Sequence, residues 1–283
     1  MVNSVTEQSP VMALEIGDEE LSEIALILEM RRNFRMSVYK DKCMKRRVAI
    51  RMRSCRCQDA SAYCNLLQQS EHELDLLQKA LTIHVSHFFR NPSTFEKLRT
   101  DVIPQLYRSS SENSTALRIW SLGCAGGEEA YSMAILLREN FVNDIRHTGI
   151  CINALDIDRE TIKAAEMGEY IPDHLKEVPD VIRERYFRPK DSRMHLTQTI
   201  RDMVRFSVGD ITMVDQYLPH DLVLCRNTLI YFSRPEQEKI LNGIADILPL
   251  GGILVLGRSE TLVGDVRRRF SAVCPIERIY RRI

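Results

Sequence analysis

Two adjacent carboxylates, Glu128 and Glu129, follow a short glycine-rich segment, Gly123 to Gly127. An apolar stretch, Leu117 to Trp120, precedes this segment, and a helical pattern follows it over Ala130 to Leu137. A strand, a glycine turn and a helix in this order form the entry to a nucleotide-type pocket in an open α/β sheet, because glycine lets the backbone turn tightly and approach a ligand. The spacing Gly-x-x-Gly-Gly differs from the Gly-x-Gly-x-x-Gly of dinucleotide-binding proteins.

The two carboxylates indicate the charge of the ligand. In a first helical turn, acidic side chains often do no more than complement the partial positive charge of the helix N-terminus. In this pocket they would also repel a phosphate, so a cationic ligand with an amino-acid end fits better. S-adenosylmethionine is one such ligand.

Further polar residues stand where later predicted strands end. Asp156 follows the apolar run Gly149 to Leu155, at the place where doubly wound folds bind a ribose, although a simple strand-end acid is the alternative. Asp210 ends the next strand pattern and is placed to meet an adenine. Another buried run, Asp221 to Asn227, leads into the same predicted pocket.

Three segments carry a family resemblance. Residues 127–132 read Gly-Glu-Glu-Ala-Tyr-Ser, and residues 226–232 read Arg-Asn-Thr-Leu-Ile-Tyr-Phe. These are similar to the Gly-Glu-Glu-x-Tyr-Ser and Arg-Asn-x-x-Ile-Tyr-Phe motifs of the CheR-type methyltransferases, which methylate glutamates on bacterial chemoreceptors. The segment His84 to Arg90 resembles the family's Asn-x-Thr-x-Phe-Phe-Arg, which closes over the cofactor, with His84 in place of Asn and Ser86 in place of Thr. Asp210-Ile211 departs from the usual Asn-Leu, and the resemblance runs from about Tyr39 to the C-terminus.

The resemblance implies a protein-glutamate O-methyltransferase that converts S-adenosylmethionine to S-adenosylhomocysteine. It places Arg90 and Tyr231 nearest the reaction, with Tyr231 as a plain core aromatic residue in the alternative interpretation. A glutamate side chain, with a pKa of about 4.3, is already an anion at neutral pH and needs no general base. We accordingly find no His–Asp or Ser–His pair in the pocket sequence. The implied cofactor contacts are His84, Ser86, Arg90, Glu128, Asp156, Asp210, Ile211, Arg226 and Asn227.

The order of patterns predicts the architecture. Strand–helix repeats that end in a hairpin indicate a class I methyltransferase, a Rossmann-like α/β sheet with an antiparallel last strand. We expect a loose leader over 1–18, an N-terminal helical domain over 19–112 and an S-adenosylmethionine-binding methyltransferase domain over 113–283. Within the last, residues 169–203 interrupt the rhythm and predict a small inserted antiparallel β-subdomain. In the family such an insertion can contact the receptor.

A basic segment, Arg31 to Arg56, lies in the middle of the helical domain and contains one acidic residue, Asp41. A charge run often only faces water. The functional interpretation is a docking surface for an acidic protein helix, such as the cytoplasmic region of a chemoreceptor. Nucleic acid is disfavoured, because few aromatic residues are interleaved for base stacking.

Composition excludes other classes. The 283 residues have a formal net charge of zero, and no apolar run approaches the roughly 20 residues of a membrane span. The N-terminus lacks a signal-peptide pattern, so we expect a cytoplasmic protein whose eight cysteines are reduced, with no membrane insertion. Cys55, Cys57, Cys64 and His72 match no standard zinc spacing, His84 and His87 lack a third ligand, and we expect no metal. A methyltransferase with another acidic substrate and a non-catalytic cofactor sensor are the remaining alternatives.

Overall fold

The computed structural model describes residues 16–82, 85–112 and 115–283. The chain divides into two compact units, Met1–Leu81 and Thr82–Ile283. The sequence predicts a domain boundary near residue 112, whereas the structure assigns the helices after Leu81 to the second unit. The physical reason is that Phe95, Leu98 and Ile103 are buried in one hydrophobic core with the strands of that unit.

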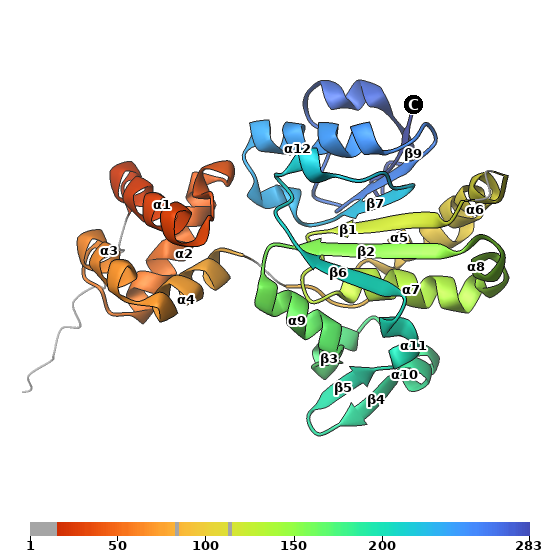
Figure 1. The fold of residues 1–283 in the computed structure, drawn as a ribbon, viewed down its shortest axis with the longest axis horizontal. Coiled ribbons are helices and arrows are strands. Elements are labelled where there is room, and N and C mark those ends of the chain that lie inside the picture. The colour runs from red at the N-terminus through yellow and green to blue at the C-terminus, as the bar shows by residue number, and fades with distance from the viewer. Residues whose placement is uncertain (1–15, 83–84, 113–114) are drawn as a thin grey trace, which may run out of the picture. The chain divides into compact units, whose positions relative to one another are not determined.

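The first unit is helical, as its 3.6-residue pattern predicts (Figure 1). Helix α1 packs against α3, and α2 packs against α4. Leu21, Ile24 and Leu28 of α1 are buried. The helices are α1 (Asp18–Arg32), α2 (Asp41–Ser54), α3 (Ala60–Gln69) and α4 (Glu71–Leu81), with a short 3₁₀-helix at Met36–Val38.

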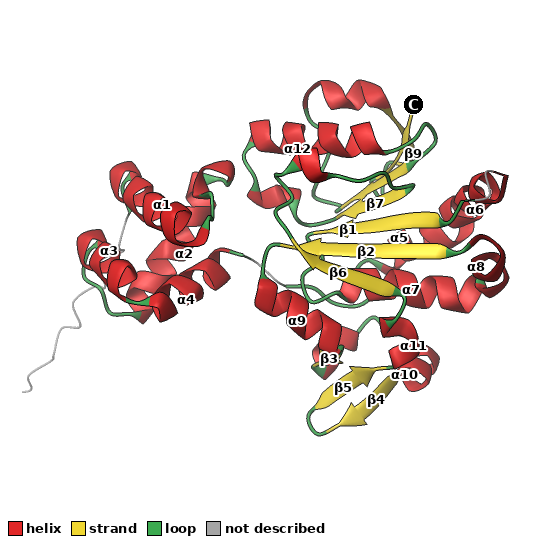
Figure 2. Ribbon diagram, viewed as in Figure 1, coloured by secondary structure: helices red, strands yellow, loops and turns green. Residues whose placement is uncertain are grey.

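The second unit is built on a mixed seven-stranded sheet with the strand order β6-β2-β1-β7-β8-β10-β9 (Figure 2). Strands β6, β2, β1, β7 and β8 are parallel to one another, and β10 pairs antiparallel with both β8 and β9. The predicted class I methyltransferase fold with a terminal antiparallel hairpin is therefore confirmed. The strands are β1 (Leu117–Leu122), β2 (Ile150–Asp156), β6 (Val204–Val208), β7 (Leu222–Cys225), β8 (Ile253–Leu256), β9 (Phe270–Cys274) and β10 (Ile279–Arg282).

Helices cover both sides of this sheet, with α12 on one side and α7 and α9 on the other (Figure 2). Because five neighbouring strands are parallel, their carboxyl ends lie along one edge, and the loops that follow them meet there. The helices of this unit are α5 (Pro92–Lys97), α6 (Ile103–Glu112), α7 (Glu128–Asn140), α8 (Val142–Thr148), α9 (Arg159–Met167), α10 (Asp180–Tyr186), α11 (Gln198–Arg201) and α12 (Arg234–Ile247), with a π-helical turn at Leu98–Val102. None of the helices in the described part of the chain is long and apolar enough to cross a membrane.

A second, three-stranded antiparallel sheet lies between α9 and β6 in the chain, inside the stretch predicted as an insertion. It has the order β3-β5-β4, with β3 (Glu169–Tyr170), β4 (Phe187–Lys190) and β5 (Arg193–Leu196). Pro189 lies in β4, which is an edge strand and tolerates a residue without an N–H. After β5 the chain forms α11, and Ile200 of that helix is buried.

Candidate active site

The glycine loop after β1 is fastened to the end of β2. The Gly123 N–H donates to the Leu155 carbonyl oxygen at 2.8 Å, and the Ala125 N–H donates to Oδ2 of Asp156 at 2.9 Å. Gly123 has a φ of 69°, and a Cβ there would lie 2.6 Å from Oγ1 of Thr228. Glycine is thus required for the loop to turn and to approach the segment after β7. Asp156 is buried, so its carboxylate is held at the carboxyl edge of the sheet.

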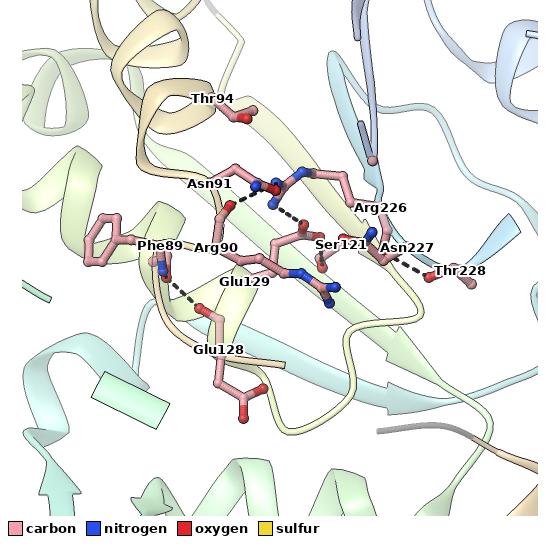
Figure 3. A network of polar contacts seen from close by, with 12 residues as sticks. Phe89, Arg90, Asn91, Thr94, Ser121, Glu128, Glu129, Arg226, Asn227 and Thr228 are labelled. Carbon is pink, nitrogen blue, oxygen red and sulfur yellow. Dashed lines mark hydrogen bonds and ion pairs between the residues drawn. The ribbon is translucent and has the colours of Figure 1, made fainter. Parts of the chain in front are cut away.

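Glu129 and Arg226 join three elements at this edge. Nη1 of Arg226 lies 3.1 Å from Oε2 of Glu129, and the Ser121 hydroxyl donates to Oε1 of the same carboxylate at 2.8 Å. Nη2 of Arg226 donates to the Arg90 carbonyl oxygen at 2.7 Å and to Oδ1 of Asn91 at 2.9 Å (Figure 3). Both Nη atoms of Arg226, a predicted cofactor contact, therefore bind protein groups that hold the 88–91 segment against β1 and α7.

Glu128 has a different environment from its neighbour. Its side chain is buried, and its carboxylate points away from the Arg226 cluster (Figure 3). Oε1 accepts a hydrogen bond from Nδ1 of His174 at 2.8 Å, whereas Oε2 is buried without a hydrogen-bond partner among the described residues. A buried carboxylate oxygen without a donor is costly in a folded protein and is expected to face a ligand. The cationic amino group of S-adenosylmethionine fits this position.

The sequence indicates no His–Asp or Ser–His pair in the pocket, but the structure places His174 beside Glu128. It lies in the 3₁₀-helix Pro172–Leu175 of the inserted region, 46 residues from Glu128 along the chain. The hydrogen bond that His174 donates to Glu128 raises the pKa of His174, and partial burial opposes this effect. No motif contains His174, so only the three-dimensional structure brings it to the site.

The segment before α5 has a strained backbone. Phe89 and Asn91 have φ values of 51° and 62°, a region that residues other than glycine seldom adopt. The Phe89 N–H donates to the Ser132 hydroxyl at 2.8 Å, and Nη1 of Arg90 donates to the Val85 carbonyl oxygen at 3.1 Å. Ser86 and Arg90 are both partly exposed. His84, a predicted cofactor contact, lies outside the described residues.

The loop after β7 is held by a residue that the sequence did not indicate, Glu260. Its Oε2 accepts from the Asn227 N–H at 2.8 Å, and its Oε1 accepts from the Ile230 N–H at 3.3 Å. Burial raises the pKa of Glu260, although N–H groups that donate to its carboxylate act in the opposite direction. Asn227 has a φ of 59°, and its buried Oδ1 has no partner among the described residues. Tyr231 ends the 3₁₀-helix of this loop and is partly exposed.

Asp210 and Ile211 lie beside the end of β2, because the Gly209 N–H donates to the Asp156 carbonyl oxygen at 2.9 Å. Oδ1 of Asp210 accepts from the Thr212 N–H and hydroxyl at 2.8 and 2.7 Å, and Ile211 is buried. The fold thus brings the predicted residues Glu128, Asp156, Asp210, Ile211, Arg226 and Asn227 to the ends of β1, β2, β6 and β7. Within the ranges that the structure covers, no group of three or more His, Cys, Asp or Glu side chains could hold a metal ion.

The sheet order, the glycine loop and the acid at the end of β2 define a class I S-adenosylmethionine-dependent methyltransferase. Comparison with known families makes this specific. The profile described as "CheR methyltransferase, SAM binding domain" matches residues 84–276, and "CheR methyltransferase, all-alpha domain" matches residues 19–82. The chain belongs to the CheR methyltransferase family, and S-adenosylmethionine is its methyl donor.

Three relatives show the extent of the similarity. The chain is 33% identical over 262 residues to an "Uncharacterized 104.1 kDa protein in hypE 3'region" of Rhodobacter capsulatus. The aligned region makes up 93% of this chain and 27% of that protein. It is 32% identical over 229 residues to a "Chemotaxis protein methyltransferase" of Listeria innocua, covering 81% of this chain and 84% of the relative. A "Chemotaxis protein methyltransferase" of Borreliella burgdorferi is 27% identical over 261 residues, and the alignment covers 89% of this chain and 91% of the relative. The chain therefore spans about a quarter of the Rhodobacter protein and most of the other two.

Proposed function

We propose that this protein transfers the methyl group of S-adenosylmethionine to glutamate side-chain carboxylates of chemoreceptors in the cytoplasm, giving glutamate methyl esters and S-adenosylhomocysteine. The cofactor-binding half of the proposal rests on the buried Oε2 of Glu128, which has no partner among the described residues and lies beside the glycine loop. The choice of substrate is supported by the relatives described as chemotaxis protein methyltransferases.

The residues divide into cofactor contacts and residues near the reaction. In the proposal Glu128 receives the amino group of the cofactor, and Asp156 binds the ribose. Asp210 and Ile211 lie toward the adenine, and Asn227 offers a buried oxygen that has no partner within the described residues. Ser86 and Arg90, with His84 beyond the described residues, contact the cofactor from the other side. The same assignment keeps Arg226 as a cofactor contact through its Nε, which is buried and unsatisfied by any described residue.

The chemistry needs alignment more than proton transfer. S-adenosylmethionine supplies a methyl group bound to a positively charged sulfur. The receptor carboxylate is ionised at neutral pH, with a pKa of about 4.3, and can attack without a base. Arg90 orients this carboxylate in the proposal, and the Tyr231 hydroxyl lines the path of the methyl group. Precise orientation of two reactants lowers such barriers by about 7–11 kcal/mol.

Several arginines of the predicted docking segment, Arg31 to Arg56, form ion pairs within the first unit. Arg51 pairs with the buried Glu73 at 2.6 Å, and Arg32 pairs with Glu71 and Asp75 at 2.6 and 2.8 Å. These arginines therefore stabilise the helical unit itself. Three exposed cations on α2, Lys42, Arg46 and Arg53, are a better candidate for the docking surface. Arg46 follows Lys42 by four residues and Arg53 follows Arg46 by seven, so the three side chains lie on one helix face. We propose that this face meets the acidic receptor helix, and that the inserted β-subdomain contacts a receptor tail.

The test is methyl transfer from labelled S-adenosylmethionine to receptor-containing membranes, followed by mild base. Release of labelled methanol from a receptor-sized band is expected, because carboxyl methyl esters are base-labile. Label that survives base would overturn the carboxylate substrate and favour N- or C-methylation by the same fold. Cofactor binding with no transfer to any receptor would instead favour the sensor alternative.

A further inference from the structure

One short stretch of the inserted region touches the cofactor side of the site at three points. The Tyr170 hydroxyl donates to the Gly126 carbonyl oxygen at 2.7 Å. The His174 carbonyl oxygen accepts from the Phe88 N–H at 2.9 Å, and the His174 side chain binds Glu128 at 2.8 Å. The ring of Phe88 packs edge-on against that of Tyr170 with centroids 4.7 Å apart. His174 is therefore held in place by its backbone and by its neighbours, and its imidazole has a fixed position relative to Glu128.

The two side chains of this pair differ in how far they are buried, and several charged groups act on the imidazole. The Glu128 side chain is 2% exposed and that of His174 is 31% exposed, so the imidazole connects a buried carboxylate to solvent. Asp173 and Glu128 favour the charged imidazolium, while Arg193 of β5 opposes it. Burial lowers the pKa of the nearby His87, with Lys176 and Arg90 acting in the same direction and Glu177 and Glu128 against them. The phenol of Tyr170 stays neutral, because burial raises its pKa well above 10.

We propose that His174 is a positioning residue for Glu128, and that its imidazolium and the cofactor's ammonium group compete for this one carboxylate, so that cofactor binding expels a proton from His174 to solvent. The inference rests on the proposed function, in which Glu128 receives the amino group.

The competition follows from charge balance in a buried site. Without cofactor, the imidazolium neutralises a carboxylate that would otherwise be a costly unpaired charge. When an ammonium group binds Oε2, two cations share one anion, and their repulsion favours loss of the proton that can leave. Neutral imidazole still donates its Nδ1–H to Oε1, so the carboxylate keeps its orientation while the charge departs.

The experiment is calorimetry of S-adenosylhomocysteine binding in buffers of different ionisation enthalpy, which counts the protons released. The wild-type protein should release a proton fraction that is largest below the raised pKa of His174. Its Kd should fall as the pH rises through that pKa, by at most about tenfold per pH unit. 5′-Methylthioadenosine, which lacks the amino-acid end, should bind without this release, and that comparison requires no variant.

The matched variants are His174→Gln, which keeps an amide donor but cannot titrate, and His147→Gln on α8, where the ring binds the Asn143 carbonyl oxygen. Only His174→Gln should abolish the proton release and flatten the pH profile of Kd. Equal proton release in wild type and His174→Gln, or none in the wild type, would overturn the role of His174 while leaving the proposed function intact. Unchanged S-adenosylhomocysteine affinity in Glu128→Gln would instead overturn the assignment of the amino group to Glu128.

Discussion

The guanidinium of Arg226 and the carboxylate of Glu129 form an ion pair between positions 97 residues apart in the chain, with side chains that are only 2% and 12% exposed. The pair joins the loop after β7 to the first turn of α7, and Nη2 of Arg226 holds the 88–91 segment. The two neighbouring glutamates thus differ: Glu129 binds Ser121 and Arg226, whereas Oε2 of Glu128 has no partner among the described residues and, in our proposal, receives the amino group of the cofactor.

Replacing Arg226 with Met should destabilise the second unit by about 3–5 kcal/mol, because the carboxylate of Glu129 would remain buried without its partner. Urea unfolding followed by fluorescence measures the change. Adding Glu129→Gln to Arg226→Met should restore part of the stability, since the unpaired charge is removed. A loss below about 1 kcal/mol for the single variant would mean that the pair is solvated more than its burial indicates.

Glu128→Gln should weaken S-adenosylhomocysteine binding by about 10- to 100-fold, the range expected when a charged hydrogen-bond acceptor is lost. Isothermal calorimetry at one pH gives the Kd directly. The affinity for 5′-methylthioadenosine serves as the control and should stay unchanged, because that ligand has no amino group. Equal weakening of both ligands would point to a collapsed glycine loop instead of a lost contact.

Charge reversal on the exposed face of α2, with Lys42→Glu, Arg46→Glu and Arg53→Glu combined, should lower kcat/KM toward receptor membranes by at least about tenfold. Affinity for S-adenosylhomocysteine should not change. The wild-type rate should fall with added salt, and the variant should lose this dependence.

The matched control carries the same change of net charge on exposed arginines of α6, α7 and α8, namely Arg108→Glu, Arg138→Glu and Arg146→Glu. It should retain receptor methylation. Loss of activity in both triple variants would show that overall charge, and not the face of α2, attracts the receptor.

The helical unit should lose stability in acid through Glu73. Burial alone would raise the pKa of this carboxylate, but hydrogen bonds from Arg51 and Tyr63 outweigh it, and the pKa lies below 4.5 in the folded protein. A lowered folded pKa means that the stabilisation is present above the unfolded pKa and is lost as the pH falls through the folded value. Unfolding free energies measured from neutral pH to about pH 3 should decline less steeply in Glu73→Gln than in wild type. Glu29→Gln, on an exposed position of α1, should follow the wild-type curve.

Local patterns predicted much of the fold, and the misses have physical causes. The glycine loop, the acid that ends β2 and the final hairpin each have a signature within a few adjacent residues. The structure places the boundary after Leu81 and not near residue 112. The periodicity of residues 92–112 predicts helices, but it does not indicate which hydrophobic core these helices join. His174 and Glu260 were missed since each reaches the site only through tertiary contacts, 46 residues from Glu128 and 33 from Asn227.

Arg226 donates a hydrogen bond to the main-chain carbonyl oxygen of residue 90 and not to its side chain. The anchoring of the segment is therefore independent of which amino acid occupies that position. A substitution at position 90 would therefore leave the hydrogen bond to Arg226 in place, although it would remove the hydrogen bond from the Arg90 side chain to the Val85 carbonyl oxygen. A series of side chains at position 90 would then test the cofactor and substrate contacts that we propose for Arg90, and in the course of evolution the same anchor would allow this position to change while the segment stays attached.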